Sequence, residues 1–354
     1  EWDNVIYGTF PYDDALPLYV SWDFGQCLSE DTEALTKTGW KHYTDIKEGN
    51  LIYTLNPNSH KGEWQPIKGK IIQEGEFDAL KIASRGLSAT FTKGHKWFVL
   101  NHKNKINSKG SLKRIEEINT AEKIPTSAEA AILPYLPLYS DNFVELVAWT
   151  WTEGYLNGKG IEIGQAIPKN IDKIRACLIS EFGESKESLL GVKIPSWTER
   201  KPTLRKNANL PLTRFYLNIY AAERVIALMD NDKAVSYDFL NALTKSQLEL
   251  FIHISMVADG KAQGKVFGQS KKERVERLSY VATLLGKRVT FASGKDRGFE
   301  NFSVHLSEKR FIHAYNFLSR KKQVSEFIYK GIVWCPTVDN HFWLARSNGT
   351  SFFT

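Results

Sequence analysis

The chain has 354 residues, of which 42% are apolar and 25% charged, and its formal net charge is +7. This length predicts two or three domains, and the composition is typical of a globular protein and excludes a disordered one. No apolar run approaches the roughly 20 residues of a membrane helix, and residues 1–26 lack the basic start and apolar run of a signal peptide.

We therefore expect a soluble monomer in the cytoplasm of a bacterial, archaeal or phage-infected cell, without a membrane partner. The three cysteines, Cys27, Cys177 and Cys335, are odd in number and sparse, which argues against a disulfide framework and a structural zinc site. A pI near 9.0 suits a polyanionic partner, although many solvated surfaces are basic.

The chain changes character along its length. Residues 1–26 hold a strand-like run over 18–22 that ends in Asp23-Phe-Gly25. From Leu51 to about Leu100, short β-type runs alternate with turn signals such as Asn56-Pro-Asn58, which predicts an all-β part. A Pro-punctuated linker over 132–137 follows, and helical periodicity begins after it.

The middle of the chain contains an internal repeat. Glu153-Gly154 precedes Gly164-Gln165, and Asp259-Gly260 precedes Gly268-Gln269. The two acids are 106 residues apart (259 − 153). From each Gln, apolar residues recur at +6, +9 and +13, which predicts one face of an amphipathic helix. Each copy therefore reads as helix, acid-Gly end, β-ribbon and helix. These apolar residues are Ile171, Ile174 and Leu178 in the first copy, and Val275, Leu278 and Ala282 in the second.

β-type sequence returns from Ile328 onward, and Asn348-Gly349 predicts a type I′ turn in a final hairpin. The simplest architecture is a multidomain chain in which an all-β domain is interrupted by an α+β domain with twofold pseudo-symmetry.

Cys27 is the residue that we expect to react with the backbone. Its thiol could attack the carbonyl of Gln26 and convert that amide into a thioester. A free thiol has a pKa of roughly 8.5, so a base must assist it, and a His with a hydroxyl donor supplies such help. A His-bearing segment, Thr92-Lys-Gly-His95, and a late thiol in Val333-Trp-Cys-Pro-Thr-Val338 follow in order.

The order and spacing of these segments resemble an intein, a Hint-type protein-splicing element. The resemblance implies a horseshoe-like splicing domain from residues 27–130 and 325–354, with the flanking host segments (exteins) as partners in cis and no cofactor. It implies that His95 acts on the amide nitrogen of Cys27 and that Thr92 orients the carbonyl. It further implies that Cys335 and His341 assist cleavage. Inteins end in Asn, and this sequence stops at Thr354, so the second cleavage needs residues absent from it.

The segments 146–154 and 252–260 resemble the two LAGLIDADG helices of homing endonucleases, within a domain over 138–322. The resemblance implies helices that pack through small residues, each delivering one carboxylate, Glu153 and Asp259, to hold Mg²⁺. Lys233 lies in a segment similar to the one whose Lys helps to activate water, with Ser236 where Pro is usual. The implied function is protein splicing plus double-strand cleavage of the host gene that lacks the element.

Polar and basic residues near the two acids would contact the DNA. Those expected to face base edges are Asn157, Lys159, Glu162 and Gln165 in the first copy, and Lys261, Gln263, Lys265 and Gln269 in the second. Those expected at phosphates are Lys193, Arg200, Lys201, Arg205, Lys206, Lys271, Lys272 and Arg274.

Simpler interpretations stay open. A lone Cys or His in a β domain is usually structural, residues 333–338 could be an edge strand ended by Pro, and the acids could be ordinary helix ends. The alternatives are a DNA-binding protein without autoprocessing and a splicing element with an inactive nuclease. Residues 1–26 would be the upstream host segment. Residues 19–25 resemble the first strand of the nuclease domain of phage terminase large subunits, where Asp23 matches a metal-binding Asp, or they belong to another host or an added leader.

Overall fold

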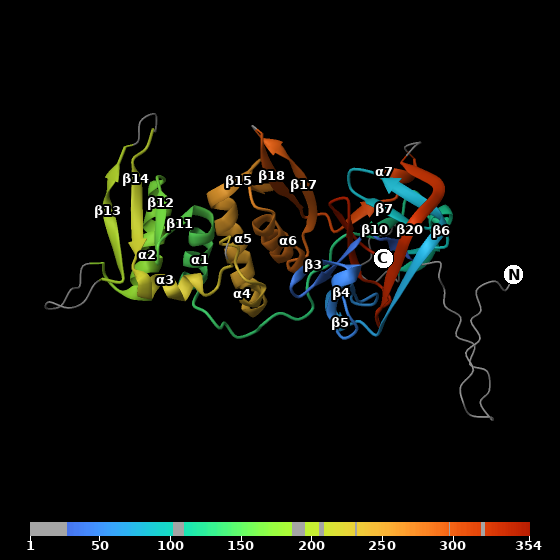
Figure 1. Ribbon diagram of the computed structural model, residues 1–354, viewed down its shortest axis with the longest axis horizontal. Coiled ribbons are helices and arrows are strands. Elements are labelled where there is room, and N and C mark those ends of the chain that lie inside the picture. Colours follow the sequence, from blue (N-terminus) through green and yellow to red (C-terminus); the bar gives the residue numbers. More distant parts are fainter. Residues whose placement is uncertain are drawn as a thin grey trace, which may run out of the picture.

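The structure, a computed structural model, describes residues 27–101, 110–185, 195–204, 209–230, 232–296, 298–319 and 323–354. The segment 1–26, with its terminase-like run, lies outside them. Figure 1 shows an elongated molecule with a β domain at one end and a mixed helix–sheet insert at the other. None of the described helices is long and apolar enough to cross a membrane.

The β domain is built from both ends of the chain. Its long antiparallel pair, β6 and β20, runs from Gly69 opposite Thr337 to Ile82 opposite Val324, and closes a barrel with β1 and β7. The elements from the first half are β1 (Leu28–Ser29), β2 (Glu33–Thr36), β3 (Gly39–His42), β4 (Leu51–Leu55), β5 (Gly62–Pro66), β6 (Gly69–Ala83), β7 (Ser88–Thr92), β8 (Lys96–Val99), β9 (Ser111–Arg114) and β10 (Lys123–Pro125). Those from the second half are β19 (Phe311–His313), α7 (Tyr315–Leu318), β20 (Val324–Thr337), β21 (Leu344–Ser347) and β22 (Thr350–Phe353).

The insert confirms the predicted repeat. Two four-stranded arrays follow the orders β11-β12-β14-β13 and β15-β16-β18-β17, and each begins directly after a helix that ends in an acid. The first copy contains α1 (Asp141–Glu153), β11 (Gly154–Asn157), β12 (Gly160–Gln165), α2 (Pro168–Phe182), β13 (Trp197–Thr203), β14 (Leu212–Leu217) and α3 (Ile219–Ile226). The second contains α4 (Tyr237–Ala242), α5 (Lys245–Asp259), β15 (Gly260–Lys261), β16 (Val266–Gln269), α6 (Lys272–Leu284), β17 (Arg288–Asp296) and β18 (Phe299–Ser307).

The acid-Gly pairs mark places where a helix turns directly into a strand. A Cβ atom on Gly154 would lie 2.2 Å from the carbonyl oxygen of Thr150, and one on Gly260 would lie 2.2 Å from that of Met256. Any other residue would collide with the last turn of its own helix. The two glycines therefore fix where Glu153 and Asp259 stand.

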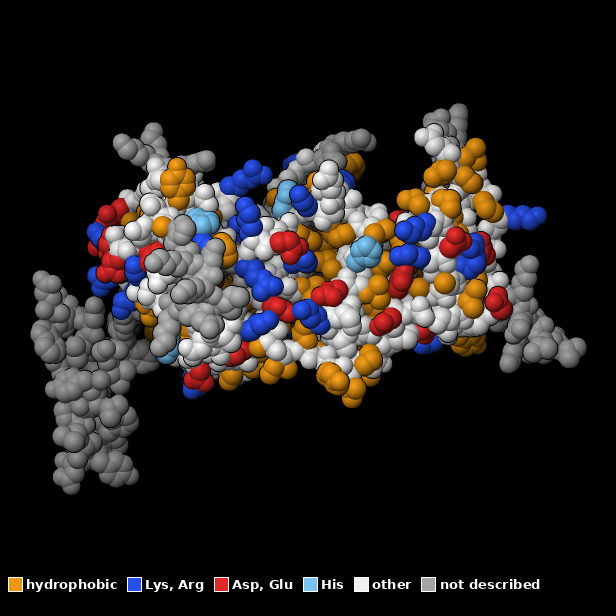
Figure 2. Space-filling model, turned by 180° about the vertical axis from the view of Figure 1, so that it is seen from behind, with side chains coloured by type: hydrophobic (Ala, Val, Ile, Leu, Met, Phe, Trp, Pro, Cys, Tyr) orange, Lys and Arg blue, Asp and Glu red, His pale blue; other side chains and the backbone are white. Residues whose placement is uncertain are grey.

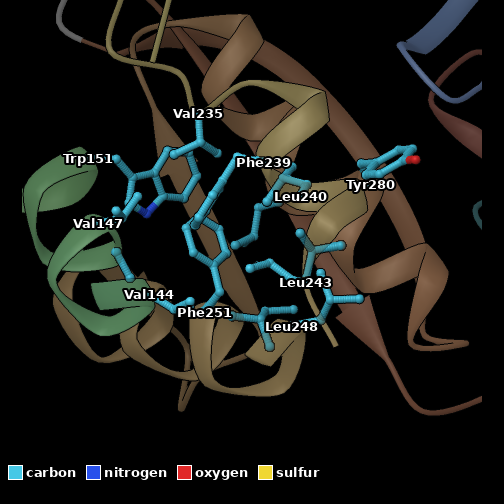
Figure 3. Close-up of a cluster of buried hydrophobic side chains, with 14 of the residues drawn as sticks. Val144, Val147, Trp151, Val235, Phe239, Leu240, Leu243, Leu248, Phe251 and Tyr280 are labelled. Carbon is cyan, nitrogen blue, oxygen red and sulfur yellow. The ribbon is translucent and has the colours of Figure 1, made fainter. Parts of the chain in front are cut away.

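Helices α1 and α5 pack against each other in the insert core (Figure 3). The rings of Trp151 and Phe251 lie tilted to each other with centroids 5.2 Å apart, and the Trp151 indole N–H donates to the Ser255 hydroxyl at 2.9 Å. The predicted packing through small residues is joined here by a large one, because a buried tryptophan of α1 meets the serine of α5. The hydrogen bond satisfies the indole nitrogen in an apolar core.

The β domain and the insert share one sheet. Thr290 of β17 pairs with Thr350 of β22, and the Phe291 amide donates to the Gly349 carbonyl at 2.7 Å. Asn348 and Gly349 have φ values of 45° and 76°, which confirms the predicted turn. The core of the β domain also takes in Ile312, Ala314 and Phe317, so the insert ends before β19, earlier than the predicted residue 322.

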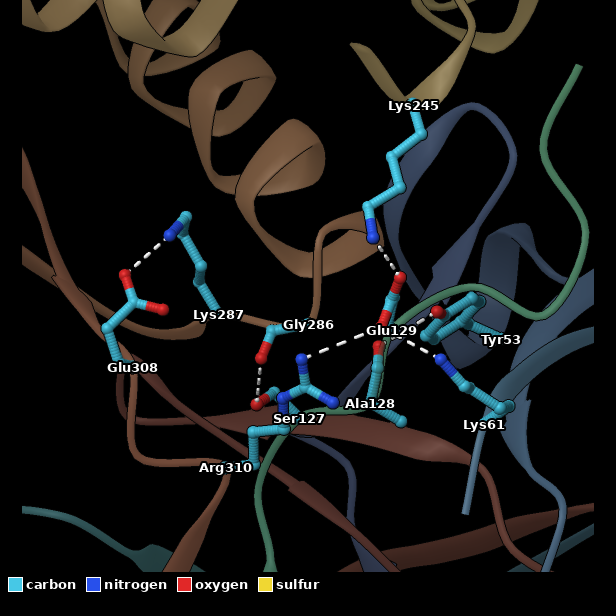
Figure 4. A network of polar contacts seen from close by, with 10 residues as sticks. All are labelled: Tyr53, Lys61, Ser127, Ala128, Glu129, Lys245, Gly286, Lys287, Glu308 and Arg310. Atoms are coloured by element: carbon cyan, nitrogen blue, oxygen red, sulfur yellow. Dashed lines mark hydrogen bonds and ion pairs between the residues drawn. The ribbon is translucent and has the colours of Figure 1, made fainter. Parts of the chain in front are cut away.

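Glu129 forms ion pairs with residues of both the β domain and the insert (Figure 4). Its carboxylate accepts from Lys245 of α5 at 2.6 Å and from Lys61 of the β domain at 2.8 Å, and Arg310 lies 3.6 Å away. The hydrogen bonds from Lys245 and then Lys61 lower the pKa of Glu129 to about 2.

We expect Glu129→Gln to lower the free energy of unfolding by about 1–2 kcal/mol at pH 7, measured by denaturant titration. A carboxylate with a lowered pKa stabilises the fold fully above its unfolded pKa, 4.5. That stabilisation is lost as the pH falls from there toward 2. The variant and the parent should therefore converge in stability at low pH, and a gap that persists unchanged would contradict the assignment. Glu308→Gln is the control, since Glu308 is 84% exposed in its pair with Lys287.

Candidate functional sites

Three strands bring Cys27 to a buried place in the β domain. Leu28, the residue after it, pairs with Trp334 of β20 and with Phe91 of β7. The Cys27 side chain is completely buried, and its Sγ lies 3.4 Å from the Sγ of Cys335. Two thiols from opposite ends of the described chain thus stand in contact, while the predicted role of Cys335 in cleavage stays a prediction.

Thr92 holds the backbone of Cys27. The Cys27 amide donates to the Thr92 hydroxyl at 3.2 Å, and the Thr92 amide donates to the Cys27 carbonyl at 3.1 Å. The sequence predicted that Thr92 orients the scissile carbonyl, that of Gln26, which lies outside the described residues. In the structure, the Thr92 hydroxyl accepts from the nitrogen of Cys27 and donates to the carbonyl of Cys27 itself at 3.3 Å.

His95 links this place to the last residue of the sequence. Its amide donates to the Thr92 carbonyl at 3.0 Å, and its Nε2 lies 2.5 Å from the Thr354 hydroxyl. The buried ring of His95 lies edge-on to Trp97 at 5.1 Å between centroids. Thr354 and Trp343 exchange two backbone hydrogen bonds, at 3.0 and 3.2 Å. Cys27, Thr92, His95, Cys335 and Thr354 form what we call the junction cluster.

Two residues stand apart from the junction cluster. His341, predicted to assist the second cleavage, is exposed with φ at 62°, in a turn where its amide donates to the Val338 carbonyl, and its role stays a prediction. Cys177 is buried in α2, and burial raises its pKa to about 12, which makes it a poor nucleophile.

The acid pair, Glu153 and Asp259, stands at the ends of α1 and α5. Burial, and next the negative charge of Asp259, raise the pKa of Glu153. The Gln165 amide lies 3.4 Å from Glu153, and the Gln269 amide donates to Asp259 at 2.6 Å. The expectation that both glutamines face DNA bases is therefore wrong. They lie on the core side of their strands, where each contacts the acid of its own copy.

Two cations accompany the acid pair. The Lys233 ammonium donates to the Gly154 carbonyl, and burial followed by the charge of Arg274 lowers the pKa of Lys233. Lys233 has φ at 58°, a conformation that non-Gly residues hold only when their surroundings enforce it. Ser236, in the place of the usual Pro, caps α4 by accepting from the Phe239 amide at 3.2 Å.

Arg274 is more deeply buried than we expected from its predicted role at DNA phosphates. It is only 8% exposed, and its guanidinium lies 5.4 Å from the centre of the Trp151 ring. Burial lowers its pKa, and the charge of Asp259 opposes that effect. Its Nε and Nη2 have no hydrogen-bond partner among the described residues. Buried unpaired donors of this kind fit an incoming anion.

The acid pair also fits a divalent cation, because two neighbouring carboxylates repel each other until a positive charge joins them. Among the described residues no three His, Cys, Asp or Glu side chains converge on one point. Glu153 and Asp259 would thus be the side-chain ligands of such a cation, and oxygens from outside the protein would complete its shell.

The predicted DNA contacts divide into several groups. Lys159, Lys201, Lys261 and Lys265 are exposed. Lys271 and Lys272 are exposed too, but they pair with Asp232 at 3.0 Å and Glu276 at 3.6 Å. Lys193, Arg205 and Lys206 lie outside the described residues.

The sequence analysis missed the polar face of β14. Arg214 contacts Glu162 at 3.1 Å, and the Arg200 guanidinium lies 5.7 Å from the Tyr216 ring centre. Buried Thr213, Phe215 and Leu217 alternate with these residues, and that period-two pattern was the available signal. Figure 2 shows Lys and Arg side chains gathered over the middle of one face of the molecule.

No protein-family model matches this chain, and no curated protein sequence matches it. Among solved structures, one part of the chain is similar to a bacterial intein-like domain from Clostridium thermocellum. The identity is 18% and the TM-score 0.24, over 28% of this chain and 66% of that domain. The DnaB intein from Synechocystis matches at 17% identity and a TM-score of 0.23, over 28% of this chain and 68% of that one.

Another part of the chain is similar to the homing endonuclease I-DmoI. The identity is 14% and the TM-score 0.34, over 48% of this chain and 89% of that one. I-DmoI has also been solved in complex with DNA and Ca. At these identities and TM-scores the likenesses assign no role to any residue, and the chain is, in separate parts, similar to inteins and to a homing endonuclease.

Proposed function

We propose that this chain is a self-splicing element that carries a site-specific DNA endonuclease. The observation that carries the proposal is the junction cluster. In it the Cys27 thiol lies against the Cys335 thiol, the Thr92 hydroxyl accepts from the Cys27 nitrogen, and the buried His95 donates its amide to the Thr92 carbonyl. A structural Cys needs no partner of this kind, whereas peptide-bond rearrangement needs a nucleophile, a group on the departing nitrogen and a proton carrier.

The first step is an N–S acyl shift. The Cys27 sulfur forms a bond to the Gln26 carbonyl carbon, the bond from that carbon to the Cys27 nitrogen breaks, and the nitrogen gains the thiol proton. Thr92 orients the nitrogen through its hydrogen bond. Cys335, with its Sγ 3.4 Å from that of Cys27, is placed to exchange a proton with the attacking thiol.

The insert supplies the second activity, hydrolysis of a DNA phosphodiester. Glu153 and Asp259 would hold Mg²⁺, which when bound neutralises phosphate charge and favours ionisation of water. Arg274 would donate to the phosphate through its unpaired N–H groups, and Lys233 would add positive charge beside it. The exposed lysines and the face of Arg214 and Tyr216 would bind the duplex.

Cys27→Ala should abolish the release of residues 1–26 by hydroxylamine or dithiothreitol, because the thioester those reagents attack cannot form without the thiol. Release is measured by the intact mass of the products. Cys177→Ala, which removes a buried thiol far from any scissile bond in this account, should release the segment as the parent does. Undiminished release from Cys27→Ala would rule the acyl shift out.

Thr92→Val should slow that release by roughly 10²-fold, because it removes the hydrogen bond to the Cys27 nitrogen at nearly constant volume. The rate constant of release at fixed dithiothreitol concentration is the readout. Thr90→Val, two residues earlier in the same strand, is the matched control and should keep the parental rate. Equal rates for Thr92→Val and the parent would remove Thr92 from the mechanism.

Asp259→Asn should lower Mg²⁺-dependent cleavage of the host gene by about 10²-fold or more while DNA binding persists, because it removes a metal-binding charge and no phosphate contact. Cleavage of labelled DNA and gel retardation report the two properties. Asp238→Asn, on the exposed side of α4, is the control. Binding without cleavage by the parent would favour the inactive-nuclease alternative.

A further inference from the structure

The second copy of the insert lacks one element of the first. In the first copy, β14 leads into α3, which buries Ala222 and Val225 and contacts β12 and β14. In the second copy, β18 leads through residues 308–310 into β19, which pairs with β10 of the β domain. The described part of the second copy therefore has no counterpart of α3, and apolar surface beside α5 stays uncovered.

An open groove lies between α5 and the end of β18. Its volume is about 780 Å³, which is within the range of roughly 300–1,000 Å³ that is usual for binding pockets. The apolar part of its lining includes Ile252, Met256, Val257 and Leu306. Val257 is 42% exposed, whereas Trp151, which lies 106 residues earlier (257 − 151) in α1, is completely buried. Figure 2 shows an apolar floor exposed in a hollow at the middle of the molecule.

Positive charge borders this apolar floor. Lys265, Lys287 and Lys309 line the groove together with one acid, Glu308. Glu308 pairs with Lys287, so within the described part of the chain the exposed Lys265 and Lys309 keep their charges without an ion pair. A segment that fits the groove should therefore carry apolar side chains next to acids and should lack cations of its own.

The first 26 residues of the chain have this chemistry. They contain five acids and no Lys or Arg, so their formal charge is −5 and that of residues 27–354 is +12 (7 + 5). Thirteen of the 26 residues are apolar, and burying them in a groove would lower the free energy of the chain. Asp13 and Asp14 stand next to each other, with Phe10 and Tyr12 before them and Leu16 and further apolar residues after them. The run 10–19 thus combines both features.

The covalent connection of this run to the β domain favours it over a free partner of the same chemistry. Asp14 precedes Cys27 by 13 residues (27 − 14), which span up to roughly 45 Å when extended. The groove borders the β domain, because Lys309 lies two residues before β19, which pairs with β10. A tether of this length gives a local concentration on the order of millimolar.

We propose that residues 10–19 dock in the groove beside α5. Their apolar side chains would cover its floor, and the two adjacent acids would face Lys265 and Lys309. The segment before Cys27 is then held at two places, by its peptide bond to Cys27 and by the groove of the insert. Lys265, which the proposed function assigns to the duplex, is covered while the segment is docked. The inference does not depend on the acyl shift, because docking breaks no bond.

The test places a photoreactive side chain in the groove of the full chain. Val257 is replaced by p-benzoylphenylalanine, an equal mixture of ¹⁵N-labelled and unlabelled protein is irradiated, and crosslinked peptides are identified by mass spectrometry. We expect crosslinks to residues 10–19 of the same chain. The same replacement of Tyr220, which is 71% exposed on α3, is the control and should give none to this run. Crosslinks from position 257 that join a labelled to an unlabelled chain, or that do not reach residues 10–19, would overturn the inference.

Charge reversal tests the pairing of the acids with the lysines. Asp13→Lys combined with Asp14→Lys should lower the yield of the crosslink from position 257 by about fivefold, because attraction to the groove becomes repulsion. Adding Lys265→Glu and Lys309→Glu should restore the yield. Asp3→Lys, outside the run 10–19, is the control and should keep the parental yield. An unchanged yield after the first reversal, or no recovery after the second, would overturn the inference.

Discussion

The pairing of β6 with β20 is the constraint on which the rest of the molecule depends. These strands come from the two halves of a domain that the insert separates, and they pair from one end to the other. Because Trp334 of β20 also pairs with Leu28, the ladder places Cys335 beside Cys27. Without it the two thiols would belong to distant parts of the chain, and no local sequence preference would bring them together.

The insert obeys a different constraint, set by backbone geometry at two glycines. Each allows a helix to stop abruptly at an acid and continue as a strand, since a Cβ at either place would meet a carbonyl oxygen. The acids then stand together in a half-buried place, where desolvation and mutual repulsion favour a cation. The sheet that β17 and β22 share and the ion pairs of Glu129 connect the domain of the acid pair to the domain of the junction cluster.

Much of this arrangement could be predicted from the sequence because it is periodic. The repeat, the acid-Gly ends and the Asn348-Gly349 turn all depend on neighbours within a few residues. The side chains of Gln165 and Gln269 were assigned to the wrong face of their strands. Alternating residues define two faces of a strand but do not show which face lies toward the core. The end of the insert at β19 was misplaced because tertiary pairing determines it. The contact of Trp97 with His95 and the unpaired donors of Arg274 could not be predicted. Both depend on tertiary contacts that do not appear in any local sequence pattern.

The central claim is that the Cys27 sulfur bonds to the carbonyl carbon of its predecessor. The most direct measurement is the carbon NMR signal of a Gln26 carbonyl labelled with ¹³C, recorded with the parent chain and with Cys27→Ser as reference. The account predicts that part of the signal of the parent moves from the amide region to the thioester region and leaves it when hydroxylamine is added, because hydroxylamine converts the thioester into a hydroxamate and frees the Cys27 thiol. A signal that stays wholly in the amide region, under conditions where residues 1–26 are nevertheless released, would contradict it.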